Sequence, residues 1–565
     1  MQSERIRLKT LLFAVLFFGI FGLANFSHAA SPVLFYSDIT SGPNSGGQND
    51  KGVFATVWGK GFGDNQDDSH ITVGGGLVDN YPEWSDTKIC FQLGSEAATG
   101  DIVVVVGGIS SNGLPFTVRT GNIYFISSDG SGDGSHDAPM SPTNFCNVIK
   151  TNKGSIGYFR AGTYTGEYAH AGWHAMFTLE AGHSGLMGQE NAFIAYPGEI
   201  VTLSHVGEGE RSIFRIMDTN EHDIVVAKFR MISTNGAVAT HSRWRVVGND
   251  IDAIHAISAS GAITTGQYQD NTSEAIYIYG NNIHGGSSGA NVDHAIYPGS
   301  GSSNVFIGWN YIHDNNFGTG ATISLNCNNA YNLELVSENV RIFNNIIDMS
   351  AYGGRATGVF ETGDGSSVYH YNNVIIGPPS NQNDTMYAHS ANVYYYNNTL
   401  YNVGSLYHAG VFSFYADTIS GSGYTHDYAP ESITLRNNIV YAASNASSYL
   451  NCLNISGTNN VPTPINDHNL WHGIGSFAGH SGCDNGCGEN GNSLESDPLF
   501  SNAPSDLSIS ASSSAINVGA DMSTIFTTDI NGLIRTDAFD IGAYEYVESG
   551  GDTTAPQSPA GLSVR

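Results

Sequence analysis

The chain has 565 residues, of which 40% are hydrophobic and only 13% are charged. Such a chain is too apolar to be intrinsically disordered and too long for one ordinary domain. With 69 glycines and 29 tyrosines against 21 lysines and arginines, the composition favours turns and aromatic-rich strands. Helical bundles and coiled coils are therefore excluded.

The first 29 residues have the parts of a secretory signal peptide. Three basic residues between positions 5 and 9 precede an apolar run over 11–23, and a small-x-small cleavage motif ends at Ala29. The run is short for a bilayer span, so we expect secretion and not membrane anchoring.

The mature chain is strongly acidic. Removal of the signal peptide takes away three basic residues and Glu4, so the formal net charge of −30 becomes −32. A surface of this sign excludes nucleic acid as the partner. It suits divalent cations bound by carboxylate oxygens. We expect a monomer without a transmembrane segment.

All six cysteines follow the signal peptide, and in an oxidising compartment their even number permits full disulfide pairing. Cys483 and Cys487 lie in a stretch rich in glycine and asparagine and predict a locally closed loop. The sequence supplies no clear second pair of ligands for zinc beside them.

Residues 30–119 predict a small β-sandwich, because short alternating strands are separated by glycine turns. The segments 42–47, 58–63 and 111–118 resemble the immunoglobulin-like IPT/TIG domain. That module usually serves as a spacer or binding accessory, so we assign it no chemistry.

Residues 120–548 contain an internal repeat in which a short β-rich run is followed by asparagine and an apolar residue. The first asparagines stand at positions 249, 281, 310, 344, 372, 397 and 437, in steps of 32, 29, 34, 28, 25 and 40 residues. A unit this short cannot bury its own apolar face, so the units must stack as coils. Asparagine suits the corners because its amide can bond along the stack and its backbone tolerates the left-handed region. The repeat predicts an all-β fold, a right-handed parallel β-helix; the variable steps disfavour a β-propeller.

Several segments of this region resemble pectate-lyase-like β-helix proteins, in particular polysaccharide lyase family 9 and its relatives. The segments that carry the resemblance at the two ends are 124–134, 160–164, 195–199, 497–500, 514–519 and 528–546. The resemblance implies a lyase-like scaffold whose last segments form closing coils. Residues 549–565 resemble a linker and the start of a fibronectin type III domain.

A groove across stacked coils presents a ladder of side chains to an extended polymer, so a linear polysaccharide is the expected partner. The most reactive segment is 292–299, in which Asp293, His294 and Tyr297 flank a short apolar pair. His294 and Tyr297 are the candidate proton-transfer pair of an elimination, and Asp293 is placed to hold the imidazole. The alternative is that His294 is a turn histidine with a structural role, hydrogen-bonded to a neighbouring coil.

A second set of candidates suggests hydrolysis instead. Glu361 ends a short apolar strand, and it lies two predicted coils from Asp293, at about 9.6 Å, within the range for an inverting pair of carboxylates. Asp364 is the other possible partner and the candidate metal ligand. Most acidic residues merely solvate loops, which is the alternative here.

The remaining candidates bind substrate or support the chemistry. His389 lies about one coil beyond Glu361 and is a further catalytic candidate, while Arg355 is a candidate for substrate binding. Sugar-stacking faces are offered by Trp309, Tyr387 and Tyr415, although aromatic ladders often only fill space. His284 and His313 occupy matching places in two repeats, which indicates a role at the repeat corner.

Family 9 enzymes are associated with a lysine base and with calcium held by aspartates. This sequence has no lysine after Lys228. Either Lys228 or another group, such as His294, Tyr297 or Arg355, takes the proton, or the reaction is not an elimination. Calcium is an expected cofactor because a carboxylate substrate entering so acidic a protein needs a neutralising cation. No organic cofactor is expected.

Three functions follow from the sequence. The first is a secreted lyase that cleaves a linear, acidic, uronate-containing polysaccharide by β-elimination. The second is a glycoside hydrolase, acting on a marine or sulfated polysaccharide among others, that uses the carboxylate pair. The third is a non-catalytic adhesin or glycan-binding protein, suggested by the accessory modules.

Overall fold

The computed structural model describes most of the chain after residue 30. The described ranges are 31–169, 174–207, 212–217, 221–253, 261–265, 273–286, 294–299, 301–316, 320–325, 335–352, 354–360, 364–377, 385–403, 411–421, 424–442, 450–454, 461–473, 491–536 and 538–547. Among these residues, no helix reaches the length and hydrophobicity needed to cross a membrane.

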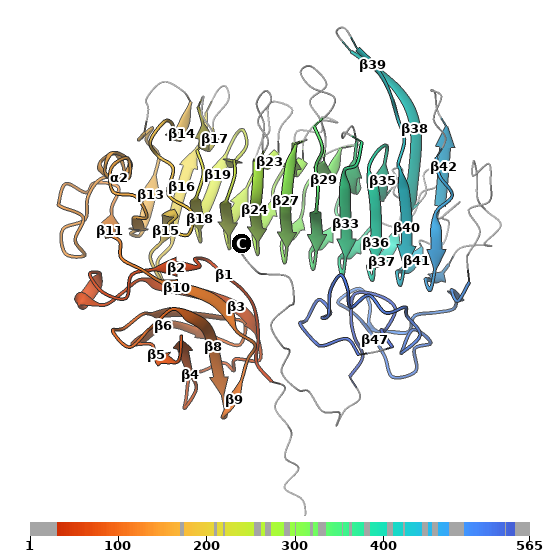
Figure 1. The fold of residues 1–565 in the computed structure, drawn as a ribbon, viewed down its shortest axis with the longest axis horizontal. Helices are drawn as coiled ribbons and strands as arrows, with labels where there is room; N and C mark the ends of the chain where they lie inside the picture. The colour runs from red at the N-terminus through yellow and green to blue at the C-terminus, as the bar shows by residue number, and fades with distance from the viewer. Residues whose placement is uncertain are drawn as a thin grey trace, which may run out of the picture.

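The N-terminal part is a β-sandwich of two sheets (Figure 1). One sheet has the order β1 (Val33–Ser37), β3 (Phe54–Lys60), β7 (Lys88–Gln92) and β6 (Asn80–Ser85). The other has the order β2 (Ser41–Gly42), β10 (Leu114–Val118), β8 (Gly100–Val106), β4 (His70–Val73) and β5 (Gly76–Leu77), with β9 (Ile109–Ser110) paired to β8. A single 3-10 turn, η1 (Gln48–Asp50), lies between β2 and β3.

The chain then winds into a right-handed parallel β-helix with three long sheets, as predicted. Sheet I contains β11 (Ile123–Ile126), β12 (Ile156–Phe159), β15 (Asn191–Ala195), β18 (Ile224–Ala227), β21 (Trp244–Val247), β24 (Ser273–Tyr279), β27 (Ser302–Gly308), β30 (Val340–Phe343), β33 (Ser367–Tyr371), β36 (Asn392–Tyr396), β40 (Ser432–Arg436) and β43 (Ile465–Asp467).

From β12 onward, each sheet I strand is followed by a strand of sheet II. Sheet II contains β13 (Gly162–Tyr164), β16 (Val201–His205), β19 (Arg230–Ser233), β22 (Asp250–Asp252), β25 (Asn282–His284), β28 (Tyr311–His313), β31 (Ile346–Asp348), β34 (Val374–Ile376), β37 (Thr399–Val403), β41 (Ile439–Ala442), β44 (Leu470–His472) and β45 (Leu494–Glu495).

Sheet III completes the coil and contains β14 (Ala175–Leu179), β17 (Ser212–Ile216), β20 (Val238–Thr240), β23 (Gly261–Thr265), β26 (His294–Pro298), β29 (Ala321–Leu325), β32 (Arg355–Val359), β35 (Met386–Ala388), β38 (Phe412–Gly421), β39 (Tyr424–Tyr428) and β42 (Leu450–Asn454). Strands β38 and β39 form a long antiparallel hairpin that rises from the column in Figure 1. The helix α2 (Pro142–Ile149) lies at the N-terminal end.

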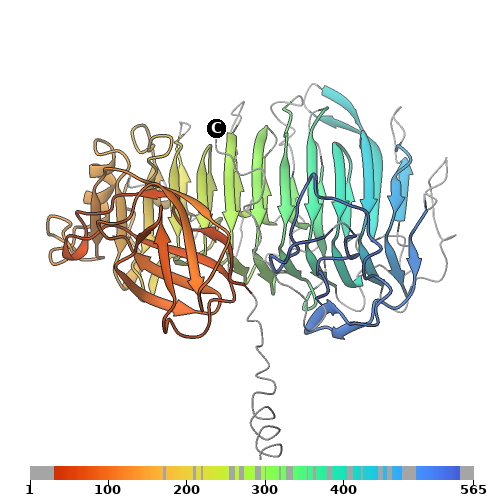
Figure 2. The same ribbon diagram turned by 60° about the horizontal axis from the view of Figure 1, so that its bottom comes forward.

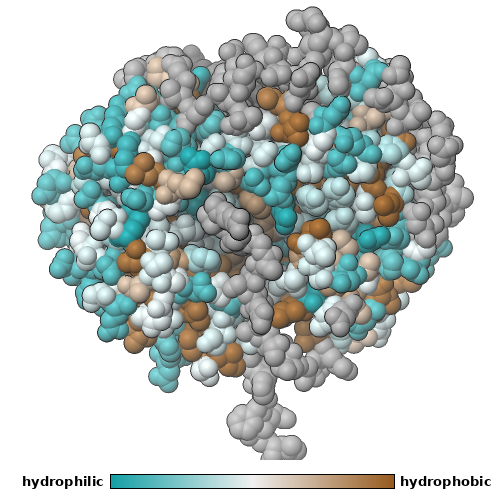
Figure 3. Space-filling view, viewed as in Figure 1, coloured by the Kyte–Doolittle hydropathy of each residue, from teal (hydrophilic) through white to brown (hydrophobic). Residues whose placement is uncertain are grey.

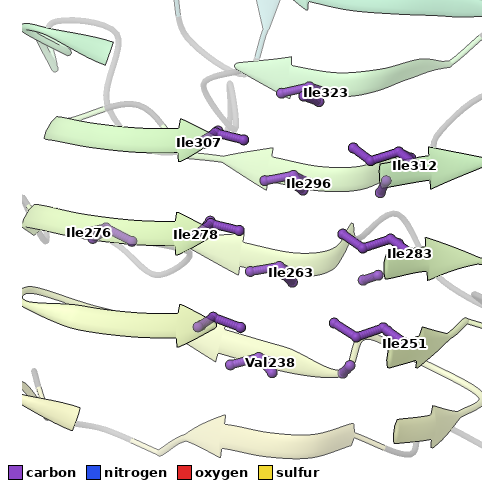
Figure 4. Close-up of a cluster of buried hydrophobic side chains, with 14 of the residues drawn as sticks. Val238, Ile251, Ile263, Ile276, Ile278, Ile283, Ile296, Ile307, Ile312 and Ile323 are labelled. Atoms are coloured by element: carbon purple, nitrogen blue, oxygen red, sulfur yellow. The ribbon is translucent and has the colours of Figure 1, made fainter. Parts of the chain in front are cut away.

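The interior of the column is built from aliphatic side chains that repeat at the same register in successive coils. Figure 4 shows one such column on sheet III, Val238, Ile263, Ile296 and Ile323, facing isoleucines of the other two sheets. These side chains are almost completely buried. Each buried aliphatic side chain contributes about 1.5–3 kcal/mol, so stacking the coils supplies the stability that a single coil lacks.

Buried asparagines form a ladder at the corner between sheets I and II. In each coil the side-chain amide donates to the carbonyl oxygen of the next asparagine at 2.9–3.0 Å. The ladder consists of Asn249, Asn281, Asn310, Asn345, Asn373, Asn398, Asn438 and Asn469. Its steps are 32, 29, 35, 28, 25, 40 and 31 residues.

The predicted register was therefore wrong by one residue in four coils. Where two asparagines are adjacent, as at Asn344 and Asn345, the second belongs to the ladder and the first has the left-handed backbone, with φ of 54° at Asn344. The two properties that we assigned to one asparagine are thus divided between neighbouring positions. We call the left-handed position of each coil the corner column; its members are Lys228, Gly248, Gly280, Trp309, Asn344, Asn372, Asn397, Asn437 and His468.

The segment after residue 495 adds no coil, unlike the predicted closing coils. It contains a short antiparallel pair, β46 (Phe500–Asn502) and β47 (Asp506–Ile509), and returns along the outside of the corner. We call residues 496–547 the C-terminal segment. It lies beside the sandwich on the same side of the column (Figures 1 and 2).

Full pairing of the six cysteines is also wrong. Cys90 and Cys146 are free, buried thiols, Cys90 in the sandwich and Cys146 in α2. They belong to separate hydrophobic clusters, so they cannot pair with each other. The predicted loop between Cys483 and Cys487 lies outside the described residues.

Candidate functional site

Sheet III carries most of the residues that the sequence identified as reactive. His294 and Tyr297 belong to β26, Arg355 to β32, Tyr387 to β35 and Tyr415 to β38, and His389 directly follows β35. Together with β29, these strands are consecutive neighbours in the sheet. At about 4.8 Å per coil, the residues extend over roughly 19 Å along the column. Sheet III therefore brings together candidates separated by more than 100 positions in the chain.

His294 begins β26 and is 7% exposed. Its Nδ1 lies 2.5 Å from the carbonyl oxygen of Ala321. Because a carbonyl only accepts, Nδ1 carries the proton in this contact and Nε2 keeps its lone pair. Burial lowers the pKa of His294 to about 4, and the contact with Ala321 opposes this only in part. The imidazole is therefore neutral near pH 7 and has the form of a base.

Tyr297 lies beside His294 with its ring nearly parallel, at 4.9 Å between centroids and 7° between planes. The pairing of Ile296 with Ile323 places Tyr297 level with Ser324 on the next coil. The Ser324 hydroxyl is buried and has no hydrogen-bond partner among the described residues. Sequence reasoning missed Ser324; its signal was a polar residue between the apolar Ile323 and Leu325.

Arg355 and Tyr387 form a second group, on the next two coils. The Arg355 guanidinium carbon lies 4.7 Å from the centre of the Tyr387 ring, and Phe360 meets the same ring edge-on at 4.4 Å. Gly358 makes room for it, since a Cβ there would lie 2.5 Å from Tyr387 Cε1. Tyr387 is only 2% exposed, so it supports the guanidinium and offers no open face to a sugar, contrary to prediction.

His389 joins this group from the C-terminal side. Its ring lies 5.0 Å from Tyr415 and 5.5 Å from Tyr387, and its backbone nitrogen donates to the Val359 carbonyl at 2.8 Å. The strand register places Arg355 level with Ala321 and hence two coils from His294, at about 9.6 Å. A cation thus lies on the same sheet as a neutral imidazole.

The carboxylate candidates give no comparable group. Asp293 and Glu361 lie outside the described residues, so their catalytic role stays a prediction. Asp364 is exposed in the turn before β33. Within the described ranges, no three His, Cys, Asp or Glu side chains lie close enough together to hold a metal ion. The described part of the chain therefore offers no ligand set for the calcium that family 9 implies.

Lys228 is not a free base. Its Nζ lies 3.0 Å from Asp38 and 2.8 Å from the Thr56 hydroxyl, both in the sandwich. Burial is the largest influence and alone would lower the pKa of Lys228, but the charge of Asp38, its hydrogen bond to Lys228 and contributions from other acidic groups together outweigh burial, so the pKa is raised. The recruitment of Lys228 that we considered is therefore wrong, because the ammonium is protonated and enclosed between two domains.

Trp309 lies in the same interface, contrary to the prediction that it binds sugar. Its ring is 5.8 Å from Phe35 and 5.3 Å from Tyr36 in the sandwich, and 4.9 Å from Phe343 in sheet I. Trp309 therefore packs the sandwich against the column at the corner between sheets I and II.

His284 and His313 stack on the outer face of sheet II, with 5.3 Å between centroids and 26° between planes. Their ring nitrogens contact Asp250 and Asn282 of the preceding coils, each at 3.0 Å. The two histidines therefore occupy equivalent positions in successive coils, as the repeat predicted.

Comparison with known proteins agrees with this architecture. Residues 37–118 match the family model of the IPT/TIG domain. No curated protein matches the sequence.

Among solved structures, the chain is similar to pectate lyase Pel9A, with 16% identity, a TM-score of 0.43 and coverage of 76% of this chain and 97% of that one. It is also similar to XylC in complex with xylose, with 10% identity, a TM-score of 0.41 and coverage of 78% and 99%. A third is the GH136 lacto-N-biosidase from Eubacterium ramulus, with 12% identity, a TM-score of 0.36 and coverage of 65% and 66%. These low values assign no activity to this chain.

Proposed function

We propose that this protein is a secreted polysaccharide lyase that cleaves a linear, uronate-containing polysaccharide by β-elimination on the outer face of sheet III. One observation supports the proposal above the others. A buried, neutral His294, stacked on Tyr297, shares its sheet with the guanidinium of Arg355, two coils away. A base, a hydroxyl donor and a cation are the groups that such an elimination needs.

In the proposed reaction, Nε2 of His294 removes the proton from the carbon next to the uronate carboxylate. The electron pair forms a carbon–carbon double bond, and the bond to the glycosidic oxygen breaks. The hydroxyl of Tyr297 gives its proton to that oxygen. Water is not consumed, so each cut leaves one unsaturated sugar and one ordinary chain end.

Arg355 binds the carboxylate in this scheme. Removing a proton next to a carboxylate places a second negative charge on the same group, and a fixed cation stabilises that charge in the transition state. Tyr387, which Phe360 meets edge-on, supports the guanidinium, so Arg355 loses little freedom on binding. Because the chain has a net charge of −30, most of its surface repels an acidic polymer. A positioned arginine therefore attracts such a polymer to this place on the protein.

Secretion and calcium dependence belong to the proposal as well. Residues 1–29 would direct export. Calcium would reduce the repulsion between the acidic protein and its substrate. A chelator measures that dependence directly.

The decisive experiment incubates the purified chain with separate acidic polysaccharides, such as polygalacturonate, alginate and glucuronan, with and without chelator. We expect the ultraviolet absorbance of unsaturated products to rise in step with new reducing ends. Reducing ends without that rise would reject elimination and favour the hydrolase that uses Glu361. Binding without any product would favour the non-catalytic protein.

A further inference from the structure

Sheet II and the turn that follows one of its strands hold the most exposed aromatic side chains of the described part of the chain. Among phenylalanine, tyrosine and tryptophan there, only Tyr311 and Tyr352 stand out, with 43% and 60% of their surface exposed. Tyr311 begins β28, and Tyr352 follows the end of β31 by four residues. These two strands are neighbours in sheet II. The two exposed residues therefore belong to neighbouring coils, Tyr311 on sheet II and Tyr352 in the turn after β31.

The Tyr311 ring is part of a fixed stack. It lies 4.2 Å from the His313 ring with 19° between planes, and His313 in turn stacks on His284. The imidazoles are held from several sides, since His284 Nε2 contacts Asp250 and His313 contacts Asn282 and Asp314 at 2.8–3.0 Å. A platform held in this way loses little side-chain entropy when a ligand binds.

The surface has a clear boundary. On the next coil Ile346 packs partly against the C-terminal segment, and from there Ile376 and Tyr401 are covered by the cluster around Leu507 and Ile530. On the other side, β19 continues the sheet and presents the exposed Arg230, level with Asp250. The stretch between Arg230 and the C-terminal segment comprises β22, β25, β28 and β31, about 14 Å along the column. We call this stretch the sheet II platform.

The charge of the sheet II platform restricts its ligand. At one position of four successive coils, the register aligns Asp252, His284, His313 and Asp348. Asp250 and Asp314 add carboxylates that are 43% and 66% exposed. A polyanion would be repelled here, whereas carboxylate, amide and imidazole groups pair well with sugar hydroxyls. Aromatic rings such as Tyr311 supply the apolar contact that orients a ligand.

From these observations we infer that the sheet II platform binds a neutral polysaccharide chain along the column axis. The ligand differs in charge from the acidic substrate proposed for sheet III. The platform would hold the protein on a neutral polymer while sheet III acts on an acidic one. The inference does not depend on cleavage, because it rests on a different sheet and a different ligand.

Electrophoresis of the full chain in native gels that contain a neutral polysaccharide tests this inference. The probes are hydroxyethyl cellulose, xylan, glucomannan and mixed-linkage glucan, with polygalacturonate and chitosan as charged comparisons. We expect at least one neutral polymer to slow migration, and Tyr311→Ala to weaken that binding about ten-fold, from the lost aromatic contact. Tyr311→Phe keeps the ring and should keep most of the affinity.

Two controls separate this effect from a general loss of exposed apolar surface and from misfolding. Met187→Ala removes another exposed apolar side chain far from sheet II, and it should migrate like the wild type in every gel. Thermal unfolding of Tyr311→Ala should match that of the wild type. Binding that persists in Tyr311→Ala, or retardation by chitosan alone, would overturn the inference, as would the absence of retardation by every neutral polymer.

Discussion

The corner between sheets I and II and the face of sheet III contain similar residue types with different roles. At the corner these residues dock other parts of the chain, whereas on sheet III they form the candidate site. At the corner, Lys228 and Trp309 contact the sandwich, and the asparagines of later coils contact the C-terminal segment. On sheet III, Arg355 and His294 lie among side chains of their own sheet. The comparison shows that a reactive residue in a β-helix must be judged by the sheet and corner to which its coil position assigns it.

The corner column explains why one edge of the β-helix can hold two different parts of the same chain, the sandwich and the C-terminal segment. Gly248 and Gly280 have φ near +60°, and a Cβ at either would meet Trp58 or Tyr36 of the sandwich within 2.7 Å. In later coils the same position is asparagine, whose amide reaches the C-terminal segment, as from Asn397 to the Asp540 carbonyl at 2.8 Å. Sandwich and C-terminal segment therefore dock on one continuous seam.

On the face shown in Figure 3, hydrophobic side chains occur in small separate groups among hydrophilic ones. Hydrophilic residues therefore make up much of the described surface on this face.

The largest expected effect tests the chemistry of sheet III. His294→Gln removes the proposed base and should lower kcat/KM by roughly 10²–10⁴-fold on the polymer that the screen identifies. His70→Gln, in β4 of the sandwich, is the matched control and should leave kcat/KM unchanged. Wild-type turnover in His294→Gln, measured by product absorbance, would exclude His294 as the base.

The next effect tests the corner. Lys228→Ala leaves the Asp38 carboxylate buried without its cation and should lower the free energy of unfolding by about 3–5 kcal/mol. Lys60→Ala, which loses only a surface contact to Asn531, should change it by less than about 1 kcal/mol. Denaturant unfolding checks both. Equal stability of the two variants would contradict a structural role for Lys228.

A smaller effect is expected inside the ladder. Asn345→Ala removes donors to Asn373 and the Ile307 carbonyl and leaves the Asn310 amide without its acceptor. The expected cost is about 1–3 kcal/mol of unfolding free energy. The exposed Asn502→Ala is the control and should stay within about 0.5 kcal/mol of the wild type. If Asn345→Ala left the free energy of unfolding unchanged, the amide hydrogen bonds along the column would contribute little to stability.

Acid should weaken the protein. Burial lowers the pKa of His294 to about 4 and that of His370 to about 3, whereas an unfolded histidine titrates near 6.5. Between these values the unfolded chain binds more protons, so stability falls as the pH drops from about 6.5 toward 3. Thermal unfolding across this range should show the decline, and His370→Phe should reduce it. The activity of a base with this pKa should persist down to about pH 5.

The smallest effect concerns Trp309. Because its ring packs on Tyr36 and Phe343 at the corner, Trp309→Phe should leave KM for the polysaccharide unchanged. A clear rise in KM without a loss of stability would contradict this prediction and show that Trp309 contacts the substrate.

The fold was predictable because its signals are local. Short apolar strands recur from coil to coil, corner asparagines recur in the coils from Asn249 to Asn469, and stacking repeats both at one register. The register within an adjacent pair such as Asn344 and Asn345 was not predictable, since both side chains are polar. Only the left-handed φ and the neighbouring coil distinguish them.

The site was predictable in part. Polar residues inside apolar strands identified His294, Tyr297, Arg355 and Tyr387, which all belong to sheet III. Sequence could not show that Tyr387 is covered by Arg355 and Phe360, nor that Ser324 lies between the two groups, because those contacts join different coils.

The sequence by itself determined a β-sandwich followed by a column of stacked coils. Each coil repeats an apolar pattern that it is too short to bury alone, so it needs a neighbouring coil. Tertiary structure decided which outer surfaces stay open, because the sandwich and the C-terminal segment cover one corner through contacts between residues that are distant in the chain, such as Arg245 and Ser37, which are 208 positions apart. Covered positions, among them those of Lys228 and Trp309, serve packing, whereas the outer faces of sheets II and III remain for ligands.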